Sequence, residues 1–326
     1  RLVPGHSDLV GRGITRLQVA QRADGGFPFI RNESIFVTAL AGIGLAGTSP
    51  RLTGRLLELA DRIAKLQQPD GGWGYAVGVA QTDVDDTSVA LEFLRAADSR
   101  RYRQEITAGL AYLRRIRGED GGFPTFVPGA ASEAAMTAAA ANAIRPGDPE
   151  GTRTLRHALE FLAERQHSDG TFEPGWSRSR ANAICRAVLA MRHAPHLDAP
   201  DVEALAGRFS ARCSRYLLDT QNPDGGWGQL PGEVSDPISS AFSVTALSHV
   251  DHDDLTHDAL SRGAHYLIGR QRSDGGFHCR PESVGPRPIL FDVPILADLY
   301  PLLALGHLET AGLRIPPAAA PGTVHP

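Results

Sequence analysis

The feature that most restricts the fold of this chain is a short motif that recurs six times. Each copy reads Gln-x-x-Asp-Gly-x-Phe or Trp, with Arg117 in place of the glutamine in the third copy. The aspartates of the six copies are Asp24, Asp70, Asp120, Asp169, Asp224 and Asp274. They lie 46 to 55 residues apart, a period that fits one helical hairpin per repeat. We therefore expect six helical hairpins that take up nearly the whole chain.

Two kinds of helix are predicted around the motifs. The stretch before a motif is apolar on one face only, as in 51–67 and 254–271, which is typical of a surface helix. The stretch after a motif is apolar on nearly every face, as in 35–46 and 181–191, which is typical of a helix surrounded by protein. Six alternations of outer and inner helix close into a ring, so the predicted fold is all-α, a single (α/α)6 barrel spanning residues 7–312.

The motif itself has a structural explanation. Glycine supplies the positive φ needed after a helix, aspartate bonds nearby backbone N–H groups, and the aromatic ring fills the gap between hairpins. We therefore expect the six motifs to build the barrel, and chemistry to lie where one repeat differs from the others.

Composition excludes several classes of function. A net charge of -4 gives no electrostatic reason to expect nucleic acid as a partner. The three cysteines, Cys185, Cys213 and Cys279, are too widely spaced to suggest disulfides or a thiolate zinc site. No apolar run is long enough to span a bilayer, so a cytoplasmic location is expected, with peripheral membrane contact left open. The Pro/Ala-rich segment 313–326 is expected to be a disordered tail.

The second repeat differs from the others by three carboxylates at the start of its inner helix, Asp83, Asp85 and Asp86. Asp83 and Asp86 share a helical face, whereas Asp85 points away from them and is expected to face the lumen. One aspartate would suffice for helix capping. Three in four residues repel one another and lose hydration, so at least one is expected to stay protonated near neutral pH. A protonated carboxyl group beside an apolar cavity is what protonation of an alkene requires.

The repeats together with Asp83-Val84-Asp85-Asp86-Thr87-Ser88 resemble the class II terpene cyclases, which include squalene–hopene cyclases and copalyl diphosphate synthases. The resemblance implies that Asp85 is the acid and that Asp83 and Asp86 orient it. It implies cyclisation of a linear C15 or C20 prenyl diphosphate with the diphosphate retained. Two alternatives stay open: a prenyl group on a meroterpenoid or triterpenoid substrate, and a non-catalytic isoprenoid-binding barrel.

Two departures from this family affect the site. Its members usually carry a second helical barrel, whereas these residues are used up by one ring, so a lid formed by 281–288, a homo-oligomer or a partner subunit is expected to cover the mouth. The histidine that polarises the acid in hopene-type cyclases is missing. Glu133, Thr137 and Asn142 are the candidates to replace it.

The substrate is expected at the mouth formed by the motif loops. Guanidinium groups suit phosphate, and aromatic faces stabilise cations. No metal ligands converge, since Asp236, Cys279 and Asp292 lack the pattern of a zinc site. Mg²⁺ is expected only with the substrate diphosphate, and no organic cofactor is expected. The candidate substrate-binding residues are Arg178, Arg180, Arg280 and Arg287 for the diphosphate, and Tyr75, Trp176 and Phe291 for the hydrocarbon, with Phe126 and Phe242 as further candidates.

Overall fold

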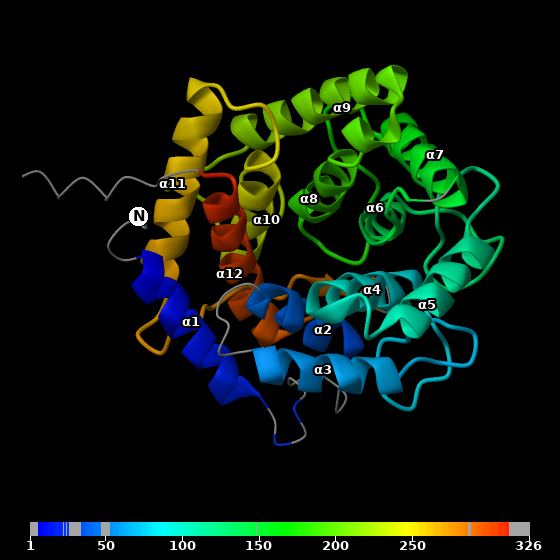
Figure 1. The fold of residues 1–326 in the computed structure, drawn as a ribbon. Helices are drawn as coiled ribbons and strands as arrows, with labels where there is room; N and C mark the ends of the chain where they lie inside the picture. Colours follow the sequence, from blue (N-terminus) through cyan, green and yellow to red (C-terminus); the bar gives the residue numbers. More distant parts are fainter. Residues whose placement is uncertain are drawn as a thin grey trace, which may run out of the picture.

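The computed structural model of the protein describes residues 6–21, 23, 25, 34–46, 53–147, 149–285 and 288–312. Twelve α-helices lie within these ranges and form two concentric rings (Figure 1). The outer ring holds α1 (His6–Ala20), α3 (Thr53–Lys65), α5 (Arg103–Ile116), α7 (Pro149–Arg165), α9 (Pro200–Asp219) and α11 (Asp254–Arg270). The inner ring holds α2 (Ile35–Leu45), α4 (Val84–Asp98), α6 (Ala134–Ala143), α8 (Arg180–Met191), α10 (Pro237–Leu247) and α12 (Pro294–Thr310).

The inner ring is closed. Each inner helix packs against the next, from α2 through α4, α6, α8 and α10 to α12, and α12 packs against α2 again. The predicted (α/α)6 barrel is confirmed, with each outer helix packed on the inner ring as Figure 1 shows.

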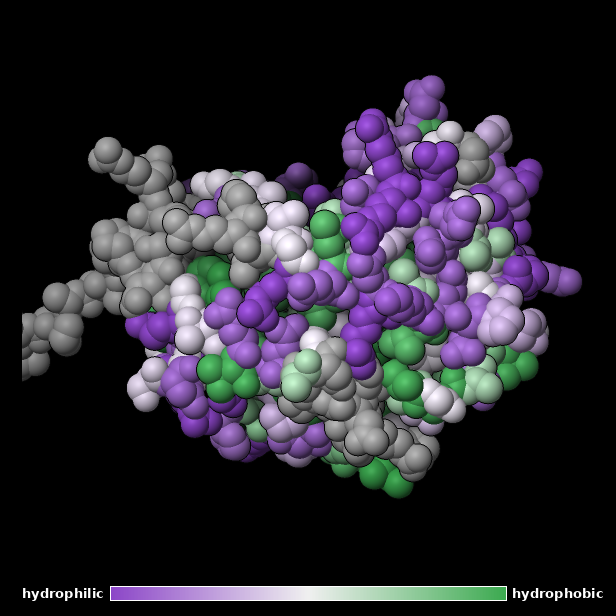
Figure 2. Space-filling model, turned by 60° about the horizontal axis from the view of Figure 1, so that its bottom comes forward, coloured by the Kyte–Doolittle hydropathy of each residue, from purple (hydrophilic) through white to green (hydrophobic). Residues whose placement is uncertain are grey.

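The burial pattern follows the two kinds of helix predicted. Every residue of α6 and α10 is buried, whereas α3 buries one face, through Leu56, Leu59, Ala60 and Ile63. On the face of the molecule shown in Figure 2, hydrophilic side chains predominate and hydrophobic ones form small separate patches. No helix in the part of the chain that the structure describes is long and apolar enough to cross a membrane.

The motifs fasten neighbouring hairpins together, as the second copy illustrates. The Gln67 side chain donates to the carbonyl of Gly71 at 2.8 Å and to that of Glu105, on the next outer helix, at 2.9 Å. Gly71 has φ +89, and a Cβ there would lie 2.4 Å from the Ala108 carbonyl oxygen, so only glycine allows this approach. The Trp73 ring is fully buried and donates to the Ile63 carbonyl. The structural interpretation of the motif is confirmed at this copy.

The end of the barrel at which the motif loops lie is covered by a two-stranded antiparallel hairpin. Its strands are β1 (Ser283–Val284) and β2 (Leu290–Phe291). Ser283 pairs with Ser177, and the Val284 N–H donates to the Trp176 carbonyl at 2.9 Å. The sequence predicted a lid in this segment, and these contacts hold 281–285 across the loop end.

Candidate active site

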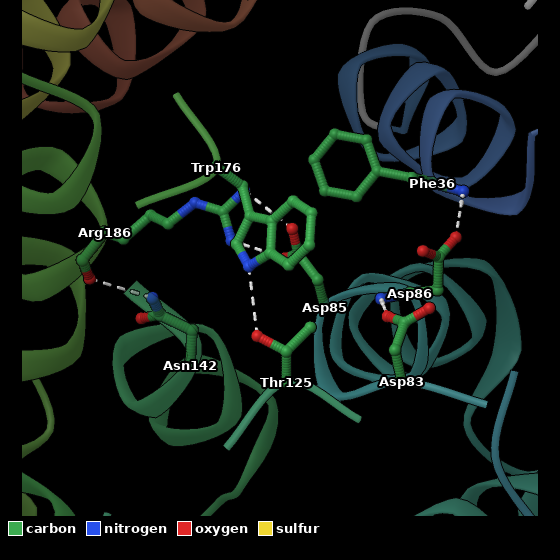
Figure 3. A network of polar contacts seen from close by, with 8 residues as sticks. All are labelled: Phe36, Asp83, Asp85, Asp86, Thr125, Asn142, Trp176 and Arg186. Carbon is green, nitrogen blue, oxygen red and sulfur yellow. Dashed lines mark hydrogen bonds and ion pairs between the residues drawn. The ribbon is translucent and has the colours of Figure 1, made fainter. Parts of the chain in front are cut away.

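The three clustered aspartates open helix α4 and face in two directions. Asp83 caps the helix, and its carboxylate accepts from the Asp86 N–H at 2.7 Å. Asp86 accepts from the N–H of Phe36 on α2 at 2.8 Å, so these two side chains join the barrel wall. Asp85 points instead into the lumen, where it meets Arg186 of α8 (Figure 3). The predicted orientation of the three side chains is found.

Burial changes the protonation of two of these carboxyl groups. Burial, followed by the charge of Asp86, raises the pKa of Asp83 well above its usual range. Burial, followed by the charge of Asp85, raises the pKa of Asp86 to about 7. The second oxygen of Asp83 is buried and accepts no hydrogen bond from the described residues. The raised pKa values of Asp83 and Asp86 agree in direction with the expectation that a carboxyl group of this cluster holds its proton near neutral pH.

The partner of Asp85 is a buried guanidinium that sequence analysis missed. Arg186 donates to both carboxylate oxygens of Asp85, with Nη2 3.2 Å from Oδ2. Its guanidinium carbon lies 5.6 Å from the centre of the Phe36 ring, which adds a cation–π contact. Burial is the largest single effect and would lower the pKa of Arg186, but Asp85, through its charge and its hydrogen bonds, and Tyr300 together raise it. Arg186 was detectable as the one charged residue within the apolar run 181–191.

The three residues expected to replace the missing histidine do not contact Asp85. Glu133 accepts from the Thr125 hydroxyl at 2.5 Å, and the hydroxyl of Thr137 accepts from the Phe123 N–H. Asn142 donates to the backbone carbonyl of Arg186 at 3.0 Å (Figure 3). Of the candidates, Asn142 alone lies near the acid, and it acts on the backbone that carries Arg186.

Asp85 lies at the inner end of the main cavity, which has a volume of about 550 Å³ and is lined by all six inner helices. Its walls include the rings of Phe36, Phe242 and Tyr300, and α6 contributes the small Ala139 together with Asn142. The Phe242 and Tyr300 rings pack edge to face, with centres 4.4 Å apart. The cavity is therefore lined largely by aromatic and apolar groups, with the polar Asp85 and Arg186 at one end.

The cavity opens at the end of the barrel opposite the motif loops, where a cluster of arginines forms its rim. Arg145 follows α6 and Arg192 follows α8; both are exposed and line the opening. Arg95 of α4 lies beside them, and burial together with the charge of Arg145 lowers its pKa to about 10. The carboxyl group near this rim, Glu92, has a pKa raised by burial to about 7. The charge of Glu92 acts on Arg95 and Arg145, but one carboxyl group beside three arginines leaves the rim with excess positive charge.

Two histidines that line the cavity, His193 and His307, stay neutral at neutral pH. Burial, followed by the charge of Arg145, lowers the pKa of His193 to about 4. Burial, followed by the charge of Arg192, lowers the pKa of His307 to about 4 as well. The positive charge of the rim at neutral pH therefore comes from its arginines.

The arginines predicted to bind the diphosphate lie outside the main cavity where the structure describes them. Arg178 donates from both terminal nitrogens to the two carboxylate oxygens of Glu233, at 2.5 and 2.6 Å, so its guanidinium group already pairs with a carboxylate. Arg180 donates to the Phe172 carbonyl at 2.9 Å, and Arg280 is an exposed loop residue; none of the three lines the main cavity. Arg287 lies outside the described residues. The diphosphate site expected at the loop end stays a prediction; the β1–β2 hairpin lies at that end, and two of the arginines, Arg178 and Arg180, already have partners within the loops.

The aromatic candidates lie on both sides of Asp85. Tyr75, Trp176 and Phe291 line a second, smaller cavity on the loop side. Phe242 lines the main cavity, as noted, whereas Phe126 packs edge to face on Trp176 with ring centres 5.6 Å apart. Of these rings, Phe242 is therefore placed to face a hydrocarbon in the main cavity.

No group of three or more metal-capable side chains gathers anywhere in the described ranges.

Comparison with known proteins places the chain among terpene cyclases. Residues 131–310 match the squalene-hopene cyclase C-terminal domain, and residues 14–177 match the prenyltransferase alpha-alpha toroid domain. The chain is 44% identical over 315 residues to drimenyl diphosphate synthase of Streptantibioticus cattleyicolor, which covers 93% of this chain and 58% of that protein. It is 26% identical over 319 residues to squalene–hopene cyclase of Alicyclobacillus acidocaldarius, covering 86% and 50%. The chain thus spans about half the length of the curated relatives it matches.

Solved structures with the same fold include proteins of different chemistry. The type II terpene cyclase MstE from Scytonema superimposes with a TM-score of 0.75 at 18% identity, covering 95% of this chain and 100% of that one. A polysaccharide lyase superimposes with a TM-score of 0.66 at 11% identity, covering 93% and 96%. The barrel alone therefore does not decide the reaction, which has to be argued from the site.

Proposed function

This chain belongs to the class II terpene cyclase family, and we propose that it cyclises a linear C15 prenyl diphosphate by protonating the terminal alkene while the diphosphate is retained. The name of the drimenyl diphosphate synthases that it resembles supports a diphosphate product. No bond to the diphosphate breaks in this reaction, so the proton is the only group that the protein has to supply.

The position of Asp85 carries this proposal. Of the three clustered aspartates, Asp85 is the one that lines the main cavity, and it does so at the inner end, among aromatic rings. The Asp85 carboxyl group gives its proton to the alkene, and Arg186 stabilises the carboxylate that remains. Asp83 and Asp86 are held by backbone N–H groups, which fixes the first turn of α4 and with it the direction of Asp85.

Asp85 transfers its proton best when the adjacent aspartates are neutral. Two neighbouring ionised carboxylates in a buried site oppose formation of a third. The raised pKa values of Asp83 and Asp86 keep this charge low at and below neutral pH. The cluster therefore favours the carboxylate of Asp85 as the product of proton transfer.

The arginine rim is proposed to hold the diphosphate. Asp85 and Arg95 are ten residues apart on α4, so their backbones lie about 15 Å apart along the helix axis. A prenyl chain entering from the rim would reach Asp85 with its far, terminal alkene. Arginine guanidinium groups suit phosphate oxygens, and Arg95, Arg145 and Arg192 together carry more charge than the neighbouring carboxyl group of Glu92 can neutralise. This arrangement replaces the loop-end site expected from the sequence.

Mg²⁺ is proposed to enter with the diphosphate. Glu92 is the one carboxyl group among the described residues that line the rim, and a single carboxylate with phosphate oxygens is a common setting for Mg²⁺. Phe36, Phe242 and Tyr300 would face the carbocation after protonation. The protein thus orients the chain, supplies the proton and excludes water, while loss of a proton or capture of water ends the reaction.

A product assay tests the proposal. The purified protein is incubated with C10, C15 and C20 prenyl diphosphates and with a prenylated aromatic acid, and extracts are analysed with and without phosphatase treatment. We expect a cyclised C15 product that appears in the organic extract only after phosphatase. A cyclised product from the prenylated acid alone would favour the meroterpenoid alternative, and no cyclised product from any substrate would refute the proposal.

A further inference from the structure

A second cavity lies on the opposite side of Asp85 from the main one. It has a volume of about 150 Å³, which is room for several water molecules. Phe36, Asp85, Arg186 and Tyr300 line both cavities, so they form the partition between them. Tyr75, another of its wall residues, is 41% exposed, so the small cavity reaches the surface at the loop end.

The small cavity contains a carboxyl group that the proposed reaction does not use. Glu282 lies in the segment that leads into β1 and is only 5% exposed. Its carboxylate accepts a hydrogen bond from the Ser177 hydroxyl and a longer one, 3.4 Å, from the Ser283 hydroxyl. No arginine or lysine of the described residues forms an ion pair with it. A buried carboxyl group with hydroxyl partners and no cation is suited to gain and lose a proton.

The reaction requires such a group because of its proton balance. Asp85 loses one proton per turnover, and the proton released when the carbocation is quenched leaves at a different carbon of the substrate. Asp85 has to regain a proton before the next cycle. While substrate or product fills the main cavity, hydrocarbon lies between Asp85 and the rim. A proton then has to arrive from the other side of the partition.

We propose that the small cavity is the proton-return path of the enzyme and that Glu282 is its relay residue. The Glu282 carboxyl group donates its proton to water in the small cavity, and that water protonates the Asp85 carboxylate. Glu282 then takes a proton from solvent at the loop end. No group other than water and the two carboxyl groups takes part, and each returns to its starting form. This inference rests on the proposed role of Asp85.

The charges around Glu282 fit a relay. Burial is the largest cause that raises its pKa, to about 7, and the charge of Asp236 at the start of α10 acts in the same direction. Arg186 of α8 acts in the opposite direction. Cys279 and Tyr300 also act on it, and burial raises the pKa of both, so both stay neutral near pH 7. Tyr75, Asp85 and Asp86 line the same cavity, and burial raises the pKa of Asp86 to about 7. Glu282 is thus divided between its two protonation states at the pH of a cell interior.

The test compares single and repeated turnovers of Glu282→Gln. Enzyme equilibrated in buffer holds Asp85 in the same protonation state whether or not the relay works, so the single-turnover rate should change less than about twofold. The steady-state rate should fall about tenfold or more, within the range typical of lost proton-transfer groups, and a burst of one product per enzyme should appear. Ser177→Ala keeps the carboxyl group and removes its hydroxyl partner, and should show a smaller burst of the same kind.

Glu119→Gln is the matched control. Glu119 is an exposed carboxyl group on the loop of the third motif, at the same end of the barrel, and lines neither cavity. Its substitution should leave both rates unchanged. Equal loss of the single-turnover and steady-state rates in Glu282→Gln, or no loss of either, would overturn the relay. If Glu282→Gln does not fold by circular dichroism, Ser177→Ala decides, and absence of a burst there overturns the relay. Wild-type enzyme that forms no product even in a single turnover would instead refute the proposed cyclase function.

Discussion

Asp85→Asn separates the chemical role of Asp85 from its contribution to stability. The amide keeps the shape of the carboxyl group but has no acidic proton, so cyclisation should fall at least about a thousandfold, near the upper range for a lost acid. The substitution also removes one of the two oxygens that accept hydrogen bonds from Arg186, and with it the counter-charge that Asp85 supplies whenever it is ionised. The side chains of Asp85 and Arg186 are 21% and 18% exposed, and removal of one partner of a buried pair costs about 3–5 kcal/mol. Because this pair borders a cavity and is not fully buried, we expect Asp85→Asn to lower the free energy of unfolding by about 2–3 kcal/mol.

The double variant Asp85→Asn/Arg186→Met tests the origin of that cost. Replacement of a buried pair by uncharged groups is often neutral, so the double variant should be more stable than Asp85→Asn alone, within about 1 kcal/mol of wild type. At about 2 °C per kcal/mol for a chain of this size, Asp85→Asn should melt about 4–6 °C below wild type. Asp201→Asn, which breaks the exposed pair with Arg156, is the control and should change Tm little.

The assay combines thermal unfolding with product formation from the C15 diphosphate. A double variant that is less stable than Asp85→Asn would refute the argument that Arg186 is destabilising when unpaired. Product formation by Asp85→Asn within about tenfold of wild type would refute the assignment of Asp85 as the acid.

Three further predictions concern the rim, the pH profile and the barrel. In steady-state kinetics, Arg145→Gln should raise KM for the prenyl diphosphate about tenfold or more with a smaller change in kcat, whereas Arg178→Gln should leave KM unchanged. A raised KM in Arg178→Gln and an unchanged KM in Arg145→Gln would indicate that the diphosphate binds at the loop end. The single-turnover rate should fall as pH rises through about 7, because Asp86 ionises there and adds a negative charge beside Asp85. Asp86→Asn should remove this fall. A pH profile that is the same in wild type and in Asp86→Asn would contradict the argument that neutral neighbouring aspartates favour proton transfer from Asp85. Gly71→Ala should lower Tm more than Gly78→Ala, since both have positive φ but only Gly71 contacts the next outer helix; equal shifts in unfolding experiments would contradict the fastening role.

The fold could be predicted because the sequence of each repeat indicates its own turn and its two helices. A motif with a positive-φ glycine stands between a one-faced and an all-apolar helix six times, and its aromatic ring is buried in the five copies in which the structure describes it. Such a pattern leaves few alternatives to a ring. The direction of Asp85 was also predictable, since helical geometry separates it from Asp83 and Asp86.

The position of the mouth could not be predicted, because it depends on which arginines find partners. Arg178 and Arg145 look alike in the sequence, but Glu233 comes within reach of Arg178 only through the folding of two loops. Arg145 meets other arginines instead, because three inner helices end at the same place. Arg186 was overlooked because the run around it was interpreted as uniformly apolar. A single cation in such a run indicates a buried partner, here Asp85.

The closure of the ring has a consequence for the order of the chain. Gln271 of the sixth motif accepts hydrogen bonds from Arg12 on α1, and a Cβ on Gly275 would lie 2.4 Å from the Arg12 carbonyl oxygen. Gly71 of the second motif makes the same kind of close approach to the carbonyl of Ala108 on the next outer helix. The sixth and first hairpins are therefore packed together in the same way as hairpins that follow each other in the sequence. Connectivity and geometry are therefore independent in this ring. A circularly permuted gene that begins at another outer helix would encode the same cavity, and hairpins could be exchanged between related barrels as cassettes.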